Sequence, residues 1–169
     1  MPHISLPEGL PGITSAFAYR PETAVHMRAL VEELMREMIA TYVSTRNNCH
    51  FCQASHRAAA ANHLDGNYEL VDAVRNDPDA AEISTKLKKL LRIAGKVQIS
   101  GKEVTPEDVE AARKEGATDR EIHDTVLIAA AFSMFNRYVD GLATFTPVDH
   151  DMYDVMGKRM AHQGYVRKS

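Results

Sequence analysis

The sequence predicts an all-α protein, and three observations lead to this prediction. Apolar residues recur at intervals of three and four along most of the 169 residues, which is the period of an amphipathic helix. Capping signals stand where several of these periodic segments begin, among them Thr105-Pro106 and Thr118 followed by Glu121. No segment shows the strict two-residue alternation and β-branched enrichment of a strand. The expected fold is therefore a helical bundle without a sheet.

The first expected helix begins at Pro21. Residues 1–20 are rich in proline and glycine, and we expect them to form a non-helical segment that lies over the domain surface. Pro21 suits the first turn of a helix, and the apolar period predicts one long helix up to about Thr45. Asn47 and Asn48 end this helix, because short amide side chains compete with the backbone for hydrogen bonds.

Six further helices complete the expected bundle. The helix that opens at Thr118 is the most apolar, so we expect it to form the spine of the bundle, with Pro147 closing it. The last expected helix, over residues 149–161, carries apolar side chains at helical spacing. These side chains are Met152, Val155, Met156 and Met160. The expected helices run from about Cys49 to Leu64, from Tyr68 to Arg75, from about Ser84 to Ile99, onward from Thr105, from Thr118 to Leu142, and over 149–161.

Composition and charge exclude several classes of protein. The length favours one domain, large enough to bury a sizeable core without structural disulfides. The formal net charge of −3 argues against nonspecific nucleic-acid binding. The N-terminus lacks the pattern of a secretory signal, and the longest apolar run, over 126–132, is far shorter than the roughly 20 residues of a membrane helix. We therefore expect a cytoplasmic protein that binds neither nucleic acid nor a membrane.

The two cysteines of the chain form one Cys-x-x-Cys pair, and His56 follows the second of them by one helical turn. In the reducing cytoplasm such a pair is more often catalytic or metal-binding than a structural bridge. The thiolate is the nucleophile, so the pKa of the attacking thiol must be lowered. The positive end of the helix favours Cys49, whereas His56 favours Cys52. Because a thiolate–imidazolium contact outweighs the dipole effect, we assign Cys52 as the attacking sulfur and Cys49 as the resolving sulfur, with Glu37 orienting His56 or accepting its proton.

Two other classes of function stay open for the same residues. A general disulfide oxidoreductase or a redox sensor would use the two sulfurs on protein or small-thiol disulfides. A metal-binding or purely structural oligomeric module is the other alternative. Structural zinc takes four ligands, and Cys49, Cys52 and His56 supply three, with Glu37 as the only obvious fourth. We expect neither a bound metal nor a cofactor.

The spacing Glu37-x11-Cys49-x2-Cys52-x3-His56 resembles the redox motif of the alkylhydroperoxidase D-like branch of the carboxymuconolactone decarboxylase superfamily. Further segments look similar to the members of this family that are called peroxidase-related. These segments are Arg20-Pro21-Glu22-Thr23, residues 91–96 and residues 135–142. The resemblance covers a helical domain over residues 1–147, and residues 148–169 look like an appended C-terminal helical extension and tail.

This resemblance implies a helical bundle of the alkylhydroperoxidase D-like type that forms homo-oligomers, from dimers to hexamers. It also implies an antioxidant oxidoreductase, a haem-free thiol peroxidase that reduces alkyl hydroperoxides. Cys52 would become a sulfenic acid, Cys49 would close the disulfide, and Glu37 and His56 would relay protons. An external dithiol or a thiol protein would then reduce the disulfide. The best-described members carry a second histidine directly before the attacking cysteine, whereas this chain has Phe51, which cannot relay protons.

Overall fold

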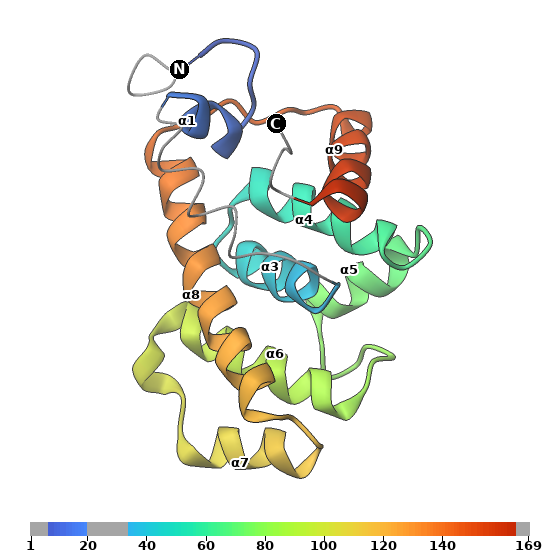
Figure 1. Ribbon diagram of the computed structural model, residues 1–169, viewed down its shortest axis with the longest axis vertical. Coiled ribbons are helices and arrows are strands. Elements are labelled where there is room, and N and C mark those ends of the chain that lie inside the picture. Colours follow the sequence, from blue (N-terminus) through green and yellow to red (C-terminus); the bar gives the residue numbers. More distant parts are fainter. Residues whose placement is uncertain (1–6, 20–33, 165–169) are drawn as a thin grey trace.

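The computed structural model describes residues 7–19 and 34–164, and over these residues the protein is a bundle of helices (Figure 1). One further turn, Gly101–Glu103, is a 3-10 helix. The described residues contain no strand, so the all-α prediction is confirmed. The α-helices are α1 (Ile13–Tyr19), α3 (Leu34–Arg46), α4 (His50–Asn62), α5 (Tyr68–Asn76), α6 (Thr85–Ile99), α7 (Pro106–Lys114), α8 (Asp119–Gly141) and α9 (His150–Gln163).

Helices α3 and α4 form the centre of the bundle. Helix α3 is buried continuously over residues 37–44, because α4, α5, α6 and α8 all pack against it. Helix α4 lies between α3 and α9, and its alanine run, residues 58–61, is buried, which lets the neighbouring helices approach closely. The long helix α8 packs against α3 and α6, as expected for a spine. In the described parts of the chain, no helix has the length and apolar character needed to cross a membrane.

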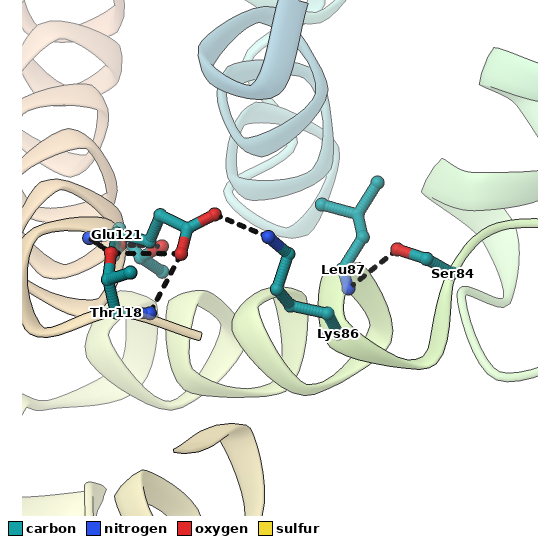
Figure 2. A network of polar contacts seen from close by, with 6 residues as sticks. Ser84, Lys86, Leu87, Thr118 and Glu121 are labelled. Carbon is teal, nitrogen blue, oxygen red and sulfur yellow. Dashed lines mark hydrogen bonds and ion pairs between the residues drawn. The ribbon is translucent and has the colours of Figure 1, made fainter. Parts of the chain in front are cut away.

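Capping contacts join the first turns of α6 and α8. The Thr118 hydroxyl accepts a hydrogen bond from the Glu121 backbone N–H at 3.2 Å, and the Glu121 carboxylate accepts one from the Thr118 N–H at 2.8 Å. This is the capping box that the sequence predicted. The other Glu121 oxygen accepts a hydrogen bond from Lys86 Nζ at 2.6 Å, while Ser84 caps α6 by accepting from the Leu87 N–H (Figure 2). The start of α8 is therefore held against the start of α6.

Two element boundaries differ from those expected, at the N-terminal segment and at the end of α8. The N-terminal segment was expected to be non-helical, but it contains the short helix α1, which packs against α8. The helix expected from Pro21 is seen from Leu34 onward, and its earlier part lies outside the described residues. Helix α8 ends at Gly141, well before Pro147. Ala143 adopts a left-handed backbone with φ 47°, and this conformation, not the proline, stops the helix.

The C-terminal helix α9 packs against α4, the helix that begins at the cysteine pair. Of the apolar residues at helical spacing in this helix, Met152 and Val155 are 42% and 73% exposed, whereas Met160 is buried and Met156 is partly buried. A Cβ atom at Gly157 would lie 2.5 Å from the Cβ of Ala58, so α9 approaches α4 along the side that carries the glycine. The buried residues of α9 are Tyr153, Gly157 and Met160. Residues 165–169, the expected tail, lie outside the described residues, and the division of the chain at residue 147 stays a prediction.

Candidate active site

The two cysteines lie at the beginning of α4. Cys49 is the N-cap residue, with φ −82° and ψ 96°, and Cys52 is the third residue of the helix. Asn48 precedes them in a left-handed conformation, φ 56°, which asparagine adopts more readily than most residues. The backbone N–H of Cys49 donates a hydrogen bond to the Ser44 carbonyl at 3.0 Å. The predicted break at the two asparagines and the predicted start of the next helix are both confirmed.

A chain of amide side chains holds this turn in place. Gln98 Nε2 donates to Asn47 Oδ1 at 2.8 Å, and Asn47 Nδ2 donates to Asn136 Oδ1 at 2.8 Å. Asn136 Nδ2 donates in turn to Ser44 Oγ at 3.0 Å. Asn136 is only 1% exposed, and both ends of its amide are paired. Sequence reasoning missed Asn136, although a polar residue at a core position of an apolar helix was the available signal.

Cys49 and Cys52 lie in one buried cluster at the start of α4. The neighbouring Cys52 side chain, as a hydrogen-bonding group, and then burial raise the pKa of Cys49 well above its ordinary value. Both residues are free thiols, and they are 0% and 3% exposed respectively. Because the thiolate is the reactive form, the raised pKa disfavours Cys49 as the sulfur that attacks first.

A carboxylate and an imidazole pair beside the dithiol. Glu37 Oε2 lies 2.7 Å from His56 Nδ1, and both side chains are buried. Glu37 comes from α3, whereas His56 lies on α4 one turn after Cys52, so the packing of α3 against α4 brings them together. The ring of Phe132, from α8, meets the His56 ring edge-on with the centroids 4.5 Å apart. The structure thus places Glu37 against His56 and puts both cysteines in one buried cluster, while the catalytic assignments of these residues stay predictions.

Apolar side chains from several helices surround the sulfurs, and we call this set the dithiol cluster. Two features were not foreseen from the sequence, namely the place of Tyr153 in this cluster and the approach of Gly12 to Phe51. Gly12 has φ 53°, and a Cβ atom there would lie 2.2 Å from the Phe51 ring, so the N-terminal segment passes over Phe51 only because residue 12 lacks a side chain. The dithiol cluster consists of buried Cys49, Phe51, Cys52, Ala58, Val139 and Tyr153, with Ile13, Ala54, Tyr68 and Met156 partly buried around it.

Two histidines near helix N-termini lie outside the dithiol cluster. His50 is exposed, with its Nδ1 atom 3.1 Å from Gln53 Nε2. His123, in the first turn of α8, is also exposed, and its Nδ1 atom lies 2.9 Å from Asp124 Oδ1. Within residues 7–19 and 34–164, no three His, Cys, Asp or Glu side chains are grouped so that they could hold a metal ion.

Solved structures with the same fold come from peroxidase-related proteins. One, from Ralstonia eutropha JMP134, is described as an alkylhydroperoxidase AhpD core; it is 26% identical, with a TM-score of 0.75, over 88% of this chain and 82% of that chain. An uncharacterized peroxidase-related protein from Silicibacter sp. TM1040 is 27% identical, with a TM-score of 0.74, over 85% of this chain and 78% of that chain. A protein of unknown function from Agrobacterium tumefaciens, suggested to be the antioxidant defence protein AhpD, is 19% identical, with a TM-score of 0.66, over 82% of this chain and 99% of that chain.

The last of these likenesses shows the fold alone, whereas the first two combine fold with sequence similarity. No protein-family model matches the chain. No curated protein matches it at a significant level. The chain therefore shares its fold and part of its sequence with peroxidase-related proteins of the alkylhydroperoxidase D-like superfamily, which confirms the resemblance carried by its Cys-x-x-Cys motif.

Proposed function

We propose that this protein is a haem-free thiol peroxidase that reduces alkyl hydroperoxides with Cys49 and Cys52. One observation carries the proposal: two buried thiols lie at the start of a helix that also bears His56, and His56 is paired with the buried carboxylate of Glu37. This set supplies a nucleophile, a resolving thiol and a proton carrier. The likeness to peroxidase-related proteins supports the same class of reaction.

Cys52 is the attacking sulfur in this reaction. It lies in the first turn of α4, where the helix dipole favours negative charge, and His56 follows it by one turn. Cys49 keeps its proton, because the neighbouring Cys52 side chain and burial raise its pKa. The Cys52 thiolate attacks the terminal oxygen of the hydroperoxide and the O–O bond breaks. Cys52 becomes a sulfenic acid, and the alkoxide leaves as an alcohol after it takes up a proton.

His56 moves that proton. Glu37 engages the Nδ1 atom of His56, so Nε2 is the ring nitrogen that exchanges protons with the reactants. His56 takes the proton from the Cys52 thiol and returns it to the departing alkoxide, while the Glu37 carboxylate balances the charge of the imidazolium. Phe51 stands where the best-described family members have another histidine, so the relay here consists of the Glu37–His56 pair.

Cys49 completes the turnover. Its sulfur attacks the sulfenic acid of Cys52, a disulfide forms, and the sulfenic oxygen leaves as water with the proton of Cys49. An external dithiol or thiol protein then reduces the disulfide through a mixed disulfide and is itself oxidised. In sum, one hydroperoxide and two donor thiols give an alcohol, water and a donor disulfide.

Self-association and location are part of the same proposal. We propose a cytoplasmic homo-oligomer, and exposed apolar side chains on α8 offer a contact face for it. Val126, Leu127 and Met134 are 37%, 40% and 46% exposed. Sedimentation of the purified protein measures the oligomeric state directly.

The test is the consumption of ethyl hydroperoxide by the purified protein with dithiothreitol as the donor. We expect Cys52→Ser to abolish turnover. Cys49→Ser should consume about one equivalent and then stop as a sulfenic acid, which dimedone traps for mass spectrometry. Gln53→Ala, a surface change in the same turn of α4, is the matched control and should keep full turnover.

The possible outcomes separate the alternatives. If both cysteine variants kept full turnover, the peroxidase assignment would be wrong. A wild-type protein that oxidised once and was not recycled by thiol donors would be a redox sensor instead. A protein that exchanged disulfides rapidly but consumed no hydroperoxide would be a disulfide oxidoreductase.

A further inference from the structure

Tyr153, on the C-terminal helix α9, closes part of the space around the dithiol. It is 6% exposed and belongs to the same buried cluster as Cys49 and Cys52. Burial, and then electrostatic interaction with Cys49 and Cys52, raise the pKa of Tyr153. A residue of the C-terminal segment is therefore part of the immediate surroundings of the sulfurs.

Two contacts hold the Tyr153 side chain in place. Its hydroxyl donates a hydrogen bond to the Pro147 carbonyl at 2.9 Å. Its ring packs at a tilt against the Phe51 ring, with the centroids 6.1 Å apart. Because the phenol keeps its proton at neutral pH, the hydroxyl stays bonded to Pro147 and the ring serves as an apolar wall of the dithiol cluster.

The neighbouring residues of α9 pack the helix against α4 (Figure 1), and one side chain bonds to α5. At Gly157 the two helices are so close that a Cβ atom would lie 2.5 Å from the backbone carbon of Ala58. Asp154 accepts a hydrogen bond from the hydroxyl of Tyr68 on α5, and the Arg57 guanidinium of α4 lies 4.4 Å from the centroid of the Tyr68 ring. Moving Tyr153 away from the sulfurs therefore disturbs a packed and hydrogen-bonded interface.

We propose that Tyr153 is a specificity-determining residue of the dithiol site, whose ring restricts access to Cys52 to narrow molecules. This inference rests on the proposed function and deepens it by naming the substrate class, namely hydroperoxides with small or unbranched alkyl groups. A bulky hydroperoxide must first displace the ring, which breaks the bond to Pro147 and loosens α9. A small hydroperoxide requires less displacement and reacts faster.

Thiol alkylation tests this inference without any peroxidase assay. The reduced protein is treated with iodoacetamide, which is small, and with fluorescein maleimide, which is bulky, and modification of Cys52 is followed by mass spectrometry. We call the rate of Cys52 modification by fluorescein maleimide, divided by the rate with iodoacetamide, the alkylation ratio. In Tyr153→Ala we expect this ratio to rise by about tenfold, since the variant already has the opening that the bulky reagent requires. Val155→Ala, on the exposed side of the same helix, is the matched control and should leave the ratio unchanged.

Two more variants keep the test decisive if Tyr153→Ala fails to fold. Tyr153→Leu keeps an apolar side chain but removes the ring and its hydroxyl. Gly157→Ala forces α9 away from Ala58 without touching Tyr153. Both should raise the alkylation ratio in the same direction, and circular dichroism establishes that each is folded. Wild-type ratios in both folded variants would overturn the proposal.

Hydroperoxide reduction then tests the substrate class. Tyr153→Leu should raise kcat/KM for cumene hydroperoxide relative to ethyl hydroperoxide by about tenfold, because a pocket wall discriminates between substrates by their size. An unchanged kcat/KM ratio beside a changed alkylation ratio would overturn the substrate assignment. If the wild-type protein reduced neither compound, the proposed function would fail, while the alkylation ratio would still decide whether Tyr153 restricts access.

Discussion

The Nδ1 atom of His56 lies 2.7 Å from the Oε2 atom of Glu37, in the buried interface between α4 and α3. A carboxylate at this nitrogen sets the tautomer and the orientation of the ring. His56 follows Cys52 by one helical turn, so the imidazole of the Glu37–His56 pair lies on the helix that begins at the two cysteines.

Replacing Glu37 by glutamine should slow hydroperoxide reduction by about 100-fold, because the amide cannot balance the charge of an imidazolium. Stopped-flow measurement of the first oxidation, over a range of pH, reports this change before the resolving step. Glu69→Gln, an exposed acid on α5, is the matched control and should leave the rate unchanged. An unaltered rate and pH profile in Glu37→Gln would contradict the assignment of the pair as the proton relay.

Replacing Asn136 by alanine should destabilise the protein by about 1–3 kcal/mol, because Asn47 and Ser44 lose buried hydrogen-bond partners. Urea unfolding measures the loss. The same change should increase hydrogen exchange at the Cys49 N–H, since that group is bonded to the Ser44 carbonyl. Asn76→Ala, at the exposed end of α5, is the control. Equal urea midpoints for Asn136→Ala and Asn76→Ala would show that the chain of amide side chains does not stabilise the turn before Cys49.

The contribution of Glu121 to the free energy of unfolding should depend on pH. Hydrogen bonds from Lys86 and then from Thr118 lower the pKa of Glu121 to about 2 from its ordinary 4.5. Between pH 4.5 and about 2, the Glu121 carboxyl is deprotonated in the folded protein but protonated in the unfolded chain. The stabilisation by this carboxylate is therefore complete above pH 4.5 and is lost as the pH falls toward 2. Because the group is partly exposed, we expect Glu121→Gln to cost about 1 kcal/mol at neutral pH.

Urea unfolding at pH 6 and at pH 3 measures the Glu121 effect. The difference in unfolding free energy between wild type and Glu121→Gln should narrow at the lower pH. Glu82→Gln, an exposed acid in a loop, should show no such narrowing. A difference that stayed constant between the two pH values would mean that the carboxylate charge contributes nothing to the junction of α6 and α8.

Local signals predicted most of the helix boundaries well. The starts of α7 and α8 follow from capping residues at Thr105 and Thr118, and the break before α4 follows from Asn47 and Asn48. Such signals work because a cap or a left-handed turn involves only a few neighbouring residues. Helix α1 carried no comparable signal and was missed, since its position depends on contacts with the far end of α8.

The sequence pattern predicted only part of the buried face of α9. Of its apolar residues at helical spacing, Met160 is buried and Met156 partly buried, whereas Met152 and Val155 are exposed. The helix turns its glycine toward α4 and also buries Tyr153. A glycine does not register as hydrophobic in a sequence pattern, although it permits the closest helix contact in the described structure of α9. The helix orientation thus follows from shape as well as from hydrophobicity.

The sequence by itself determined the arrangement of Cys49, Cys52 and His56, because residues three and four apart share a face of whichever helix they begin. The pairing of Glu37 with His56 was proposed from the residue types, and the resemblance to a known motif favoured it, but the packing of α3 against α4 brings the two side chains together. Only the tertiary structure decided how closely the two sulfurs are enclosed. Tyr153 packs in the cluster that holds both sulfurs, and Gly12 lies against Phe51 of the same cluster. Contacts between such distant segments depend on how whole helices pack, which local spacing does not encode.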